Sequence, residues 1–172
     1  MKYLQKGLLI SSVAIAMTVP KIPAEAVTLS LDGNWVGFQF GGVGSIGTPT
    51  FQFEIEAGNT AVFDVTDAFL AGDVFEVVDT NLGSLGATSF VPADGSIDEF
   101  DPDVAFSSPN FSSGTFLLEA GQYDISLVTT ESPFGAGGAF VRVPEPITIL
   151  GTVLLTSLGI VMKRSYKLKS ED

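Results

Sequence analysis

An acidic segment between positions 94 and 103 is the densest group of side chains in this chain that could do chemistry. It carries five carboxylates within ten residues: Asp94, Asp98, Glu99, Asp101 and Asp103. Oxygen ligands of this kind suit Ca²⁺, and extracellular Ca²⁺ is abundant enough to fill even a weak site. The spacing is not that of an EF-hand, which needs acidic residues at alternate positions followed by a glycine. The segment therefore predicts either a weak Ca²⁺ site or a solvated acidic loop that keeps the protein soluble.

Four further aspartates lie near the ends of expected strands, and they are weaker candidates for the same cation. They are Asp64, Asp67, Asp73 and Asp79. The commoner use of aspartate at such positions is to cap a turn with its side-chain oxygens. We therefore expect most of these four to have a structural role.

Trp35 is the only tryptophan, and its ring could form a stacking platform for a sugar. It lies on the opposite parity from Phe38 and Phe40, which predicts that it points outward from a strand or ends that strand. The alternative is a tryptophan in the core or at its rim.

The chain contains neither cysteine nor histidine. Their absence removes disulfides, thiolate metal sites and the commonest general base. No Gly-x-Ser-x-Gly motif or phosphate-binding loop is present. Paired carboxylates can hydrolyse glycosides, but among so many acidic residues such pairs arise by chance. We therefore expect no enzymatic activity and no cofactor other than Ca²⁺.

The segment 27–143 combines strong negative charge with the composition of a folded core. It holds sixteen acidic residues and one basic residue, Arg142, which gives a net charge of −15. Such a field repels nucleic acid and anionic lipid and attracts divalent cations. All fourteen phenylalanines lie in this segment, so we expect a packed domain and not a disordered chain. Its length suits one domain.

Apolar residues recur in this segment with a period of two, as in the run from Phe51 to Ile55. Eight or nine such runs, separated by glycine-rich turns, predict an all-β fold: an antiparallel β-sandwich of jelly-roll type. The similar loops at 56–60 and 119–123 suggest two equivalent hairpins. No segment before Ile147 shows the pattern of an amphipathic helix.

The N-terminus has the pattern of a secretory signal peptide. Two lysines precede an apolar run over residues 7–19, and Ala24 and Ala26 provide the small residues that signal peptidase requires. We expect residues 1–26 to form the signal peptide, with cleavage before Val27. An uncleaved anchor helix is the alternative.

The C-terminus has a second targeting pattern. Pro144, Glu145 and Pro146 precede an apolar stretch over residues 147–162, which Lys163 and Arg164 close. Sixteen residues give roughly 24 Å of helix, short of the ~30 Å hydrocarbon core but within reach of it by local thinning. We expect a single transmembrane helix, with a basic cytoplasmic tail over residues 163–172. An ordinary tail anchor and a buried core helix are the alternatives.

This order of tripeptide, helix and basic stop resembles the PEP-CTERM sorting signal of exported bacterial proteins. The resemblance covers about residues 143–169. It implies that a membrane-embedded exosortase recognises Pro144, Glu145 and Pro146, that the chain is cut near them, and that the protein passes from the inner membrane to the cell surface or outside the cell. Contact with the membrane through residues 147–162 would then be transient.

A second resemblance, over about residues 50–143, is to small secreted β-sandwich proteins of bacteria and fungi that have no assigned activity. It is carried by residues 66–77, Asp101-Pro102-Asp103 and Ser132-Pro133-Phe134-Gly135. It supports the sandwich and implies no catalytic residue.

Two functions follow as expectations. The first is a structural component of the cell envelope or exopolysaccharide matrix, with its acidic surface solubilising it or bridging through Ca²⁺. The second is a binding module for a carbohydrate or another surface ligand. Exposed aromatic rings over a shallow groove would favour the second, and a smooth acidic surface would favour the first.

Overall fold

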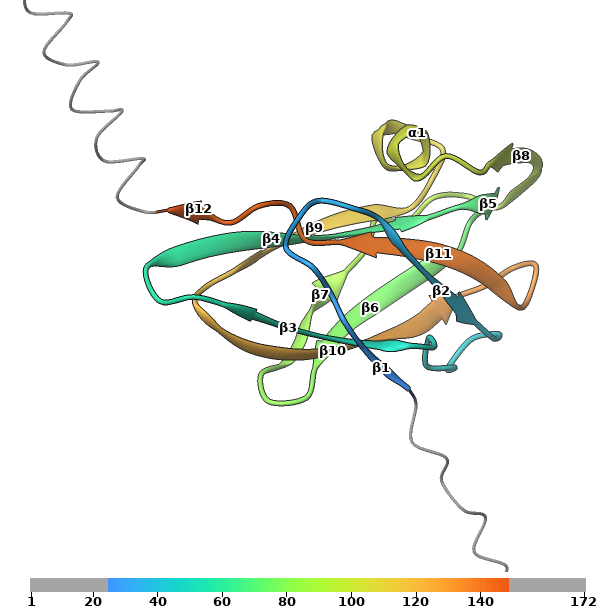
Figure 1. Cartoon of the computed structure of the whole chain (residues 1–172). Coiled ribbons are helices and arrows are strands. Elements are labelled where there is room, and N and C mark those ends of the chain that lie inside the picture. Colours follow the sequence, from blue (N-terminus) through green and yellow to red (C-terminus); the bar gives the residue numbers. More distant parts are fainter. Residues whose placement is uncertain (1–24, 149–172) are drawn as a thin grey trace, which may run out of the picture.

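The structure is a computed structural model that describes residues 25–148. Two β-sheets pack face to face, with a two-stranded sheet and a short helix at one side (Figure 1). The expected all-β fold with antiparallel sheets is therefore confirmed. Within the described range, no helix is both long and apolar enough to cross a membrane.

Sheet A has five strands. In spatial order they are β1 (Ala26–Thr28), β3 (Thr50–Ile55), β10 (Gly121–Glu131), β6 (Val74–Asp79) and β7 (Gly83–Ala87). Neighbouring strands are antiparallel except β1 and β3, which run parallel at the sheet edge.

Sheet B also has five strands. They are β9 (Ser113–Leu118), β4 (Asn59–Asp67), β11 (Gly137–Arg142), β2 (Val36–Phe40) and the short β12 (Ile147–Thr148). The central strand β4 pairs with β9, β11 and β12, and β2 pairs with β11.

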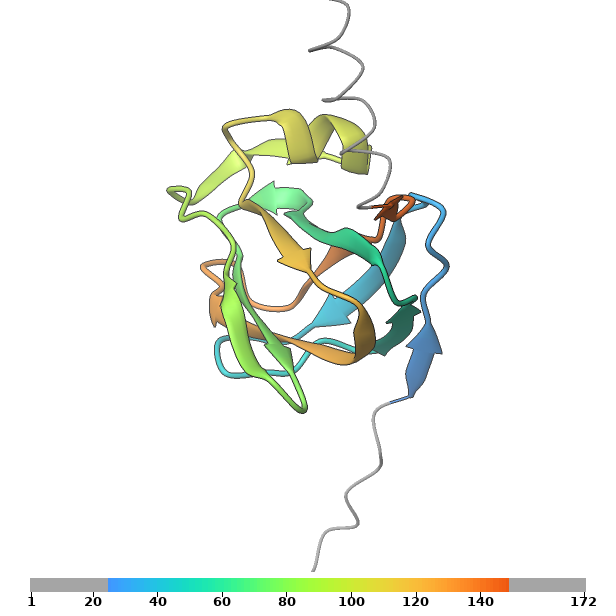
Figure 2. The same cartoon turned by 90° about the vertical axis from the view of Figure 1, so that its left-hand side faces the viewer.

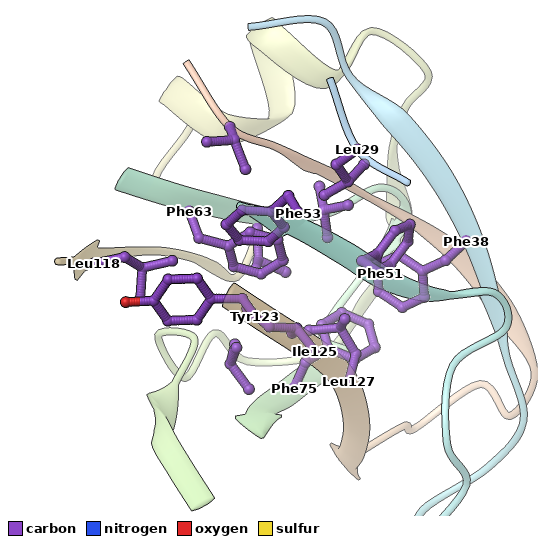
Figure 3. Close-up of a cluster of buried hydrophobic side chains, with 14 of the residues drawn as sticks. Leu29, Phe38, Phe51, Phe53, Phe63, Phe75, Leu118, Tyr123, Ile125 and Leu127 are labelled. Atoms are coloured by element: carbon purple, nitrogen blue, oxygen red, sulfur yellow. The ribbon is translucent and has the colours of Figure 1, made fainter. Parts of the chain in front are cut away.

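The sandwich core follows from the alternation in the sequence. In β3 the side chains of Phe51, Phe53 and Ile55 are buried and the residues between them are exposed. Aromatic rings meet across the two sheets in this core, as Phe53 and Phe63 do with ring centroids 5.9 Å apart (Figure 3). Burial of such large apolar side chains is the main force holding the sheets together.

Strands β5 (Phe69–Ala71) and β8 (Asp94–Glu99) form a small antiparallel sheet, and helix α1 (Pro102–Ser107) follows β8. Figures 1 and 2 show these elements on the side of sheet B that faces away from sheet A, which we call the outer face of sheet B. This helix was not predicted from the sequence, because the expectation rested on an amphipathic pattern. Its six residues are too few for a periodic pattern, although Asp101 as N-cap and Pro102 in the first turn are its sequence signals.

The two similar loops do not form hairpins. The loop after Glu56 leads from sheet A to sheet B, and the loop after Glu119 leads from sheet B back to sheet A. The four strands pair across them, with Ile55 opposite Gly121 and Ala61 opposite Leu118. The loops are equivalent corners at one end of the sandwich. The same alternation of buried residues fits a hairpin or a corner, so the sequence pattern alone does not separate the two.

The described range begins and ends inside the expected targeting segments. Ala26 lies in β1 opposite Thr50, so a cut before Val27 would shorten this strand by one residue. Ile147 and Thr148, expected to begin the transmembrane helix, instead form β12 opposite Thr60 and Asn59. This corrects the start of the expected helix, because the two residues extend sheet B along β4. The rest of it lies outside the described residues.

Candidate functional site

Four of the five expected Ca²⁺ ligands have partners within the protein. Asp94 Oδ1 accepts hydrogen bonds from the hydroxyl and amide of Ser96 at 2.6 and 2.9 Å, and these bonds lower the pKa of Asp94. Glu99 Oε1 accepts from the amides of Phe100 and Asp101, both at 2.9 Å. Asp101 itself caps α1. Each of these carboxylates therefore organises its own segment.

The other two carboxylates of this segment, Asp98 and Asp103, lie in different surroundings, and Asp103 is the fourth with a partner. Asp98 is exposed on β8 opposite Leu70, and Asp103 binds Arg142 and Trp35. Within residues 25–148 no three acidic side chains are grouped so that they could hold a metal ion. Ca²⁺ binding by this segment stays a prediction.

Arg142 on β11 connects sheet B to α1. Its Nε donates to Asp64 Oδ2 at 3.0 Å, and its Nη1 donates to Asp103 Oδ1 at 2.9 Å. Asp64 is buried and also accepts a hydrogen bond from the Thr115 hydroxyl at 2.8 Å. Because Arg142 is the only basic residue between positions 25 and 148, this pairing uses all the positive side-chain charge of that range.

Trp35 belongs to the same cluster. Its ring lies 4.2 Å from the Arg142 guanidinium carbon, its centroid lies 5.5 Å from that of Phe106, and its Nε1 donates to Asp103 at 2.9 Å. The cation–π contact covers one face of the indole ring. Trp35 lies outside the hydrophobic core, as its alternation with Phe38 predicted, and its ring packs against Arg142 and against Phe106 of α1. Sugar stacking on Trp35 stays a prediction.

The expected sorting tripeptide is an extended segment between β11 and β12. Glu145 is exposed, and Pro144 and Pro146 are half-buried. The segment begins after Val143, whose carbonyl accepts a hydrogen bond from the Gly33 amide at 3.0 Å. The other expected targeting residues, Ala24, Lys163 and Arg164, lie outside the described residues.

A shallow groove on the outer face of sheet B is the candidate ligand site. We call it the aromatic groove, and it is lined by Gly37, Phe38, Gln39, Thr48, Pro49, Phe69, Gly138, Ala139 and Phe140. Its volume is about 480 Å³, within the range of small-ligand sites. The rings of Phe69 and Phe140 lie side by side in it, with centroids 6.1 Å apart and planes inclined by 28°. Phe100, which is 66% exposed, contacts Phe69 edge-on.

Two glycines make room for these rings. A Cβ on Gly138 would lie 2.8 Å from the Phe69 ring, so this ring requires the missing side chain. A Cβ on Gly37 would lie 3.5 Å from the Phe140 ring, an ordinary contact distance. The outward positions of β2 and β11 thus alternate between glycine and larger residues, and the two rings pack against the glycines.

Phe69 holds its position in a strained conformation. Its φ of 68° lies in the left-handed region, which non-glycine residues rarely adopt. Strain of this kind persists only where the surrounding structure enforces it, and it is concentrated at functional sites. Here it turns the chain directly after β4, so that the Phe69 ring lies over Gly138 on the outer face of sheet B.

Asp67 fixes this turn from inside the protein. It is fully buried; its Oδ1 accepts the amide of Ala68 at 2.8 Å, and its Oδ2 accepts the amides of Gly72 and Asp73 at 3.1 Å. The expectation that the aspartates near strand ends act in turns is confirmed for Asp67. We refer to residues 67–73 as the Phe69 turn.

The Phe69 turn contains two buried acidic side chains. Burial and the negative charge of Asp73 raise the pKa of Asp67 to about 7, against the opposing effect of the three amides. Burial also raises the pKa of Asp73, and the neighbouring polar side chain of Ser132 opposes this rise. Oδ1 of Asp73 is buried without a hydrogen-bond partner in the described part of the chain.

The sequence contained one signal for the groove. Phe140 alternates with Ala139 and Val141, which are buried, so it is a large aromatic side chain at an outward position of a strand. No comparable signal marks Phe69, because its place depends on a left-handed turn that no glycine or asparagine announces.

Comparison with protein-family models, with curated proteins and with solved structures gives no match. The function is therefore argued from the geometry of the site and the chemistry of its residues.

Proposed function

We propose that this protein is an exported, surface-sorted binding module that holds a neutral glycan in the aromatic groove. The observation that carries the proposal is the pair of half-buried rings, Phe69 and Phe140, in a groove of about 480 Å³ that Gly37 and Gly138 help to line. The apolar faces of sugar rings stack on aromatic side chains, and a shallow groove admits a chain that continues past both ends. The Gln39 amide, also in the lining, supplies a donor and an acceptor for hydroxyl groups.

The charge of the molecule selects among ligands. Residues 25–148 contain eighteen acidic side chains and one basic side chain, which is already paired with Asp64 and Asp103. The resulting field repels nucleic acids and anionic polysaccharides. A neutral polysaccharide is attracted by stacking and hydrogen bonds without this electrostatic penalty.

A binding role is compatible with the expected place of the protein in the exopolysaccharide matrix. The signal peptide over residues 1–26 and the PEP-CTERM-like tail support export, handling by signal peptidase and an exosortase, and final location at the cell surface or outside it. We propose that the protein contributes to the matrix by binding its glycan and has no enzymatic role. Ca²⁺ bridging through the acidic surface is an additional proposal, supported by the charge alone.

We also infer the finer fold class. The four neighbours β2, β11, β4 and β9 in sheet B, and β3, β10, β6 and β7 in sheet A, alternate between sheets along most of the chain. This is the arrangement of two interleaved Greek keys, which supports a jelly roll.

The binding test uses variants that differ by one methyl group. Gly37→Ala places a methyl in the groove at an ordinary contact distance from Phe140, and Gly42→Ala is the matched control, since its Cβ would meet nothing within 4 Å. The mature protein is titrated by calorimetry with neutral hexasaccharides of β-linked glucose, mannose and N-acetylglucosamine.

We expect at least one hexasaccharide to bind, with affinity lowered by about tenfold or more in Gly37→Ala and in Phe140→Ala. Gly42→Ala should bind as the unchanged protein does. Binding that is equal in all variants, or absent for every neutral glycan, would refute the proposed site.

Sorting is tested separately by intact mass of the protein from its native host. A secreted species that starts at Val27 and ends near Pro144, Glu145 or Pro146 is expected. A membrane-bound species that keeps residues 147–172 would contradict exosortase processing.

A further inference from the structure

The Phe69 turn couples a buried acid pair to one wall of the aromatic groove. Asp67 accepts amide hydrogen bonds from both ends of the turn, at Ala68 and at Gly72 and Asp73. Between these anchors lies Phe69, whose strained backbone holds its ring against Gly138 and beside Phe140. A change in the charge of Asp67 or Asp73 therefore acts directly on the segment that positions the ring.

Among residues 25–148, no positive side chain neutralises this pair. The charged groups on the elements packed against the turn are Asp64 on β4, Glu76 on β6, Asp94, Asp98 and Glu99 on β8, Asp101 and Asp103 at the start of α1, Glu131 on β10 and Arg142 on β11. All but Arg142 are acidic, and Arg142 is bound to Asp64 and Asp103. A second negative charge buried next to the first is costly, because neither solvent nor a counter-charge offsets it.

Among the described residues, the negative charge of Asp73 is the less well stabilised of the two. Oδ1 of Asp73 has no donor among the described residues, whereas both oxygens of Asp67 accept amides. A proton on the Asp73 carboxyl removes the repulsion and leaves the amide bonds of Asp67 intact. Two carboxyl groups in one buried site commonly hold a single proton between them for this reason.

We infer that Asp67 and Asp73 share one proton in the folded protein and form a proton-controlled latch that fixes Phe69 at the wall of the aromatic groove. Loss of the proton places two charges inside the Phe69 turn, and the turn relaxes from its strained conformation. The groove then loses one of its two rings. The pKa of Asp67, raised to about 7, places the change near neutral pH.

The latch is tested first without any ligand. The side-chain carboxyl carbons of Asp67 and Asp73 and the amide of Phe69 are followed by NMR in the mature protein, from about pH 4 to about pH 9. We expect the pair to take up its last proton near neutrality, with the Phe69 signals moving at the same midpoint. In Asp73→Asn the Asp67 midpoint should fall and the movement of Phe69 near neutrality should disappear. Asp124→Asn, on the outer side of sheet A, is the matched control and should behave as the unchanged protein.

Three results would overturn the latch: titration of both carboxyl groups below about pH 5, Phe69 signals that ignore the titration, or an Asp67 midpoint unchanged in Asp73→Asn. A shift of the Asp73 carboxyl signal on addition of excess Ca²⁺ at neutral pH would overturn it as well, because a cation would then occupy the pair.

The link to the groove rests on the proposed glycan binding and is tested with the same neutral hexasaccharides. Affinity should fall by about fivefold or more between about pH 5 and about pH 8, and this fall should vanish in Asp73→Asn. Affinity equal at both pH values would refute the link. If no hexasaccharide binds at any pH while the NMR titration is as expected, the glycan proposal fails and the latch stands.

Discussion

Asp79 shows how one carboxylate organises a hairpin. Its Oδ1 accepts the amides of Asn81 and Leu82, both at 2.8 Å, and its Oδ2 accepts the amide of Asp124 at 2.9 Å. Burial raises the pKa of Asp79, but the three amides outweigh this effect, and the net pKa is lowered. The pKa of Asp79 is thus lowered and that of Asp67 is raised, although both aspartates end a strand.

Replacing Asp79 by alanine should therefore destabilise the protein. We expect the free energy of unfolding to fall by about 1–3 kcal/mol at neutral pH, because three amides lose their acceptor. The stabilisation by Asp79 is fully present above the pKa that Asp79 has in the unfolded chain, and it is lost as the pH falls through the lower pKa of the folded state. The free energies of unfolding of the variant and the unchanged protein should therefore become similar in strong acid. Urea denaturation at several pH values measures the loss of stability and its dependence on pH. Equal stability of the two proteins at neutral pH would contradict the prediction.

At the scale of elements, α1 depends on one side chain from sheet B. Arg142 binds Asp103 in the first turn of the helix and lies over Trp35 and Phe106. A lysine cannot reproduce a planar fork that binds two carboxylates while its face covers a ring. The helix has only six residues, so it has little stability of its own.

Arg142→Lys should loosen α1 while the sandwich stays folded. Trp35 is the only tryptophan, so its fluorescence reports on this contact alone, and we expect a red shift as the ring becomes more exposed to water. Thr115→Val is the control, because it removes a hydrogen bond to Asp64 without touching α1. An unchanged emission spectrum in Arg142→Lys would show that the helix docks by other contacts.

Some elements of this fold can be predicted from the sequence, and others cannot. Strands such as β3 and β10 were predictable, because a half-buried strand requires the alternation seen from Phe51 to Ile55. The corners at Gly58 and Ala120 and the left-handed turn at Phe69 were not, since they depend on which sheet receives the next strand. The aromatic groove combines both kinds of feature. The outward position of Phe140 follows from the alternation in β11, whereas the position of Phe69 depends on the left-handed turn.

For the whole molecule, the balance of charge predicts an unusual pH dependence. The pKa of Asp67 is raised to about 7, so between its unfolded value of 3.8 and about 7 the folded state binds more protons than the unfolded state. The free energy of unfolding therefore falls as the pH rises through this window and levels off above it. Repulsion among eighteen carboxylates acts in the same direction, and salt screens it.

We expect the melting temperature to rise by roughly 5 °C or more when the pH is lowered from about 8 to about 5. Added NaCl at pH 8 should raise it by a smaller amount. Scanning calorimetry of the mature protein gives both values, with Asp73→Asn as the variant in which the pH effect should shrink. A melting temperature that is highest at pH 8 would contradict this account.

For a protein that is exported as proposed, the single arginine of residues 25–148 has a further consequence. Trypsin-like proteases cut after lysine or arginine, and between Lys21 and Lys163 the chain offers them Arg142 alone. That side chain is half-buried and paired with two carboxylates, so the folded domain is expected to resist such enzymes. The same scarcity means that a complete tryptic digest of the mature protein leaves residues 27–142 as one fragment, too long for routine peptide mass spectrometry. Surveys of secreted proteins that rely on trypsin would therefore overlook this one even where it is abundant.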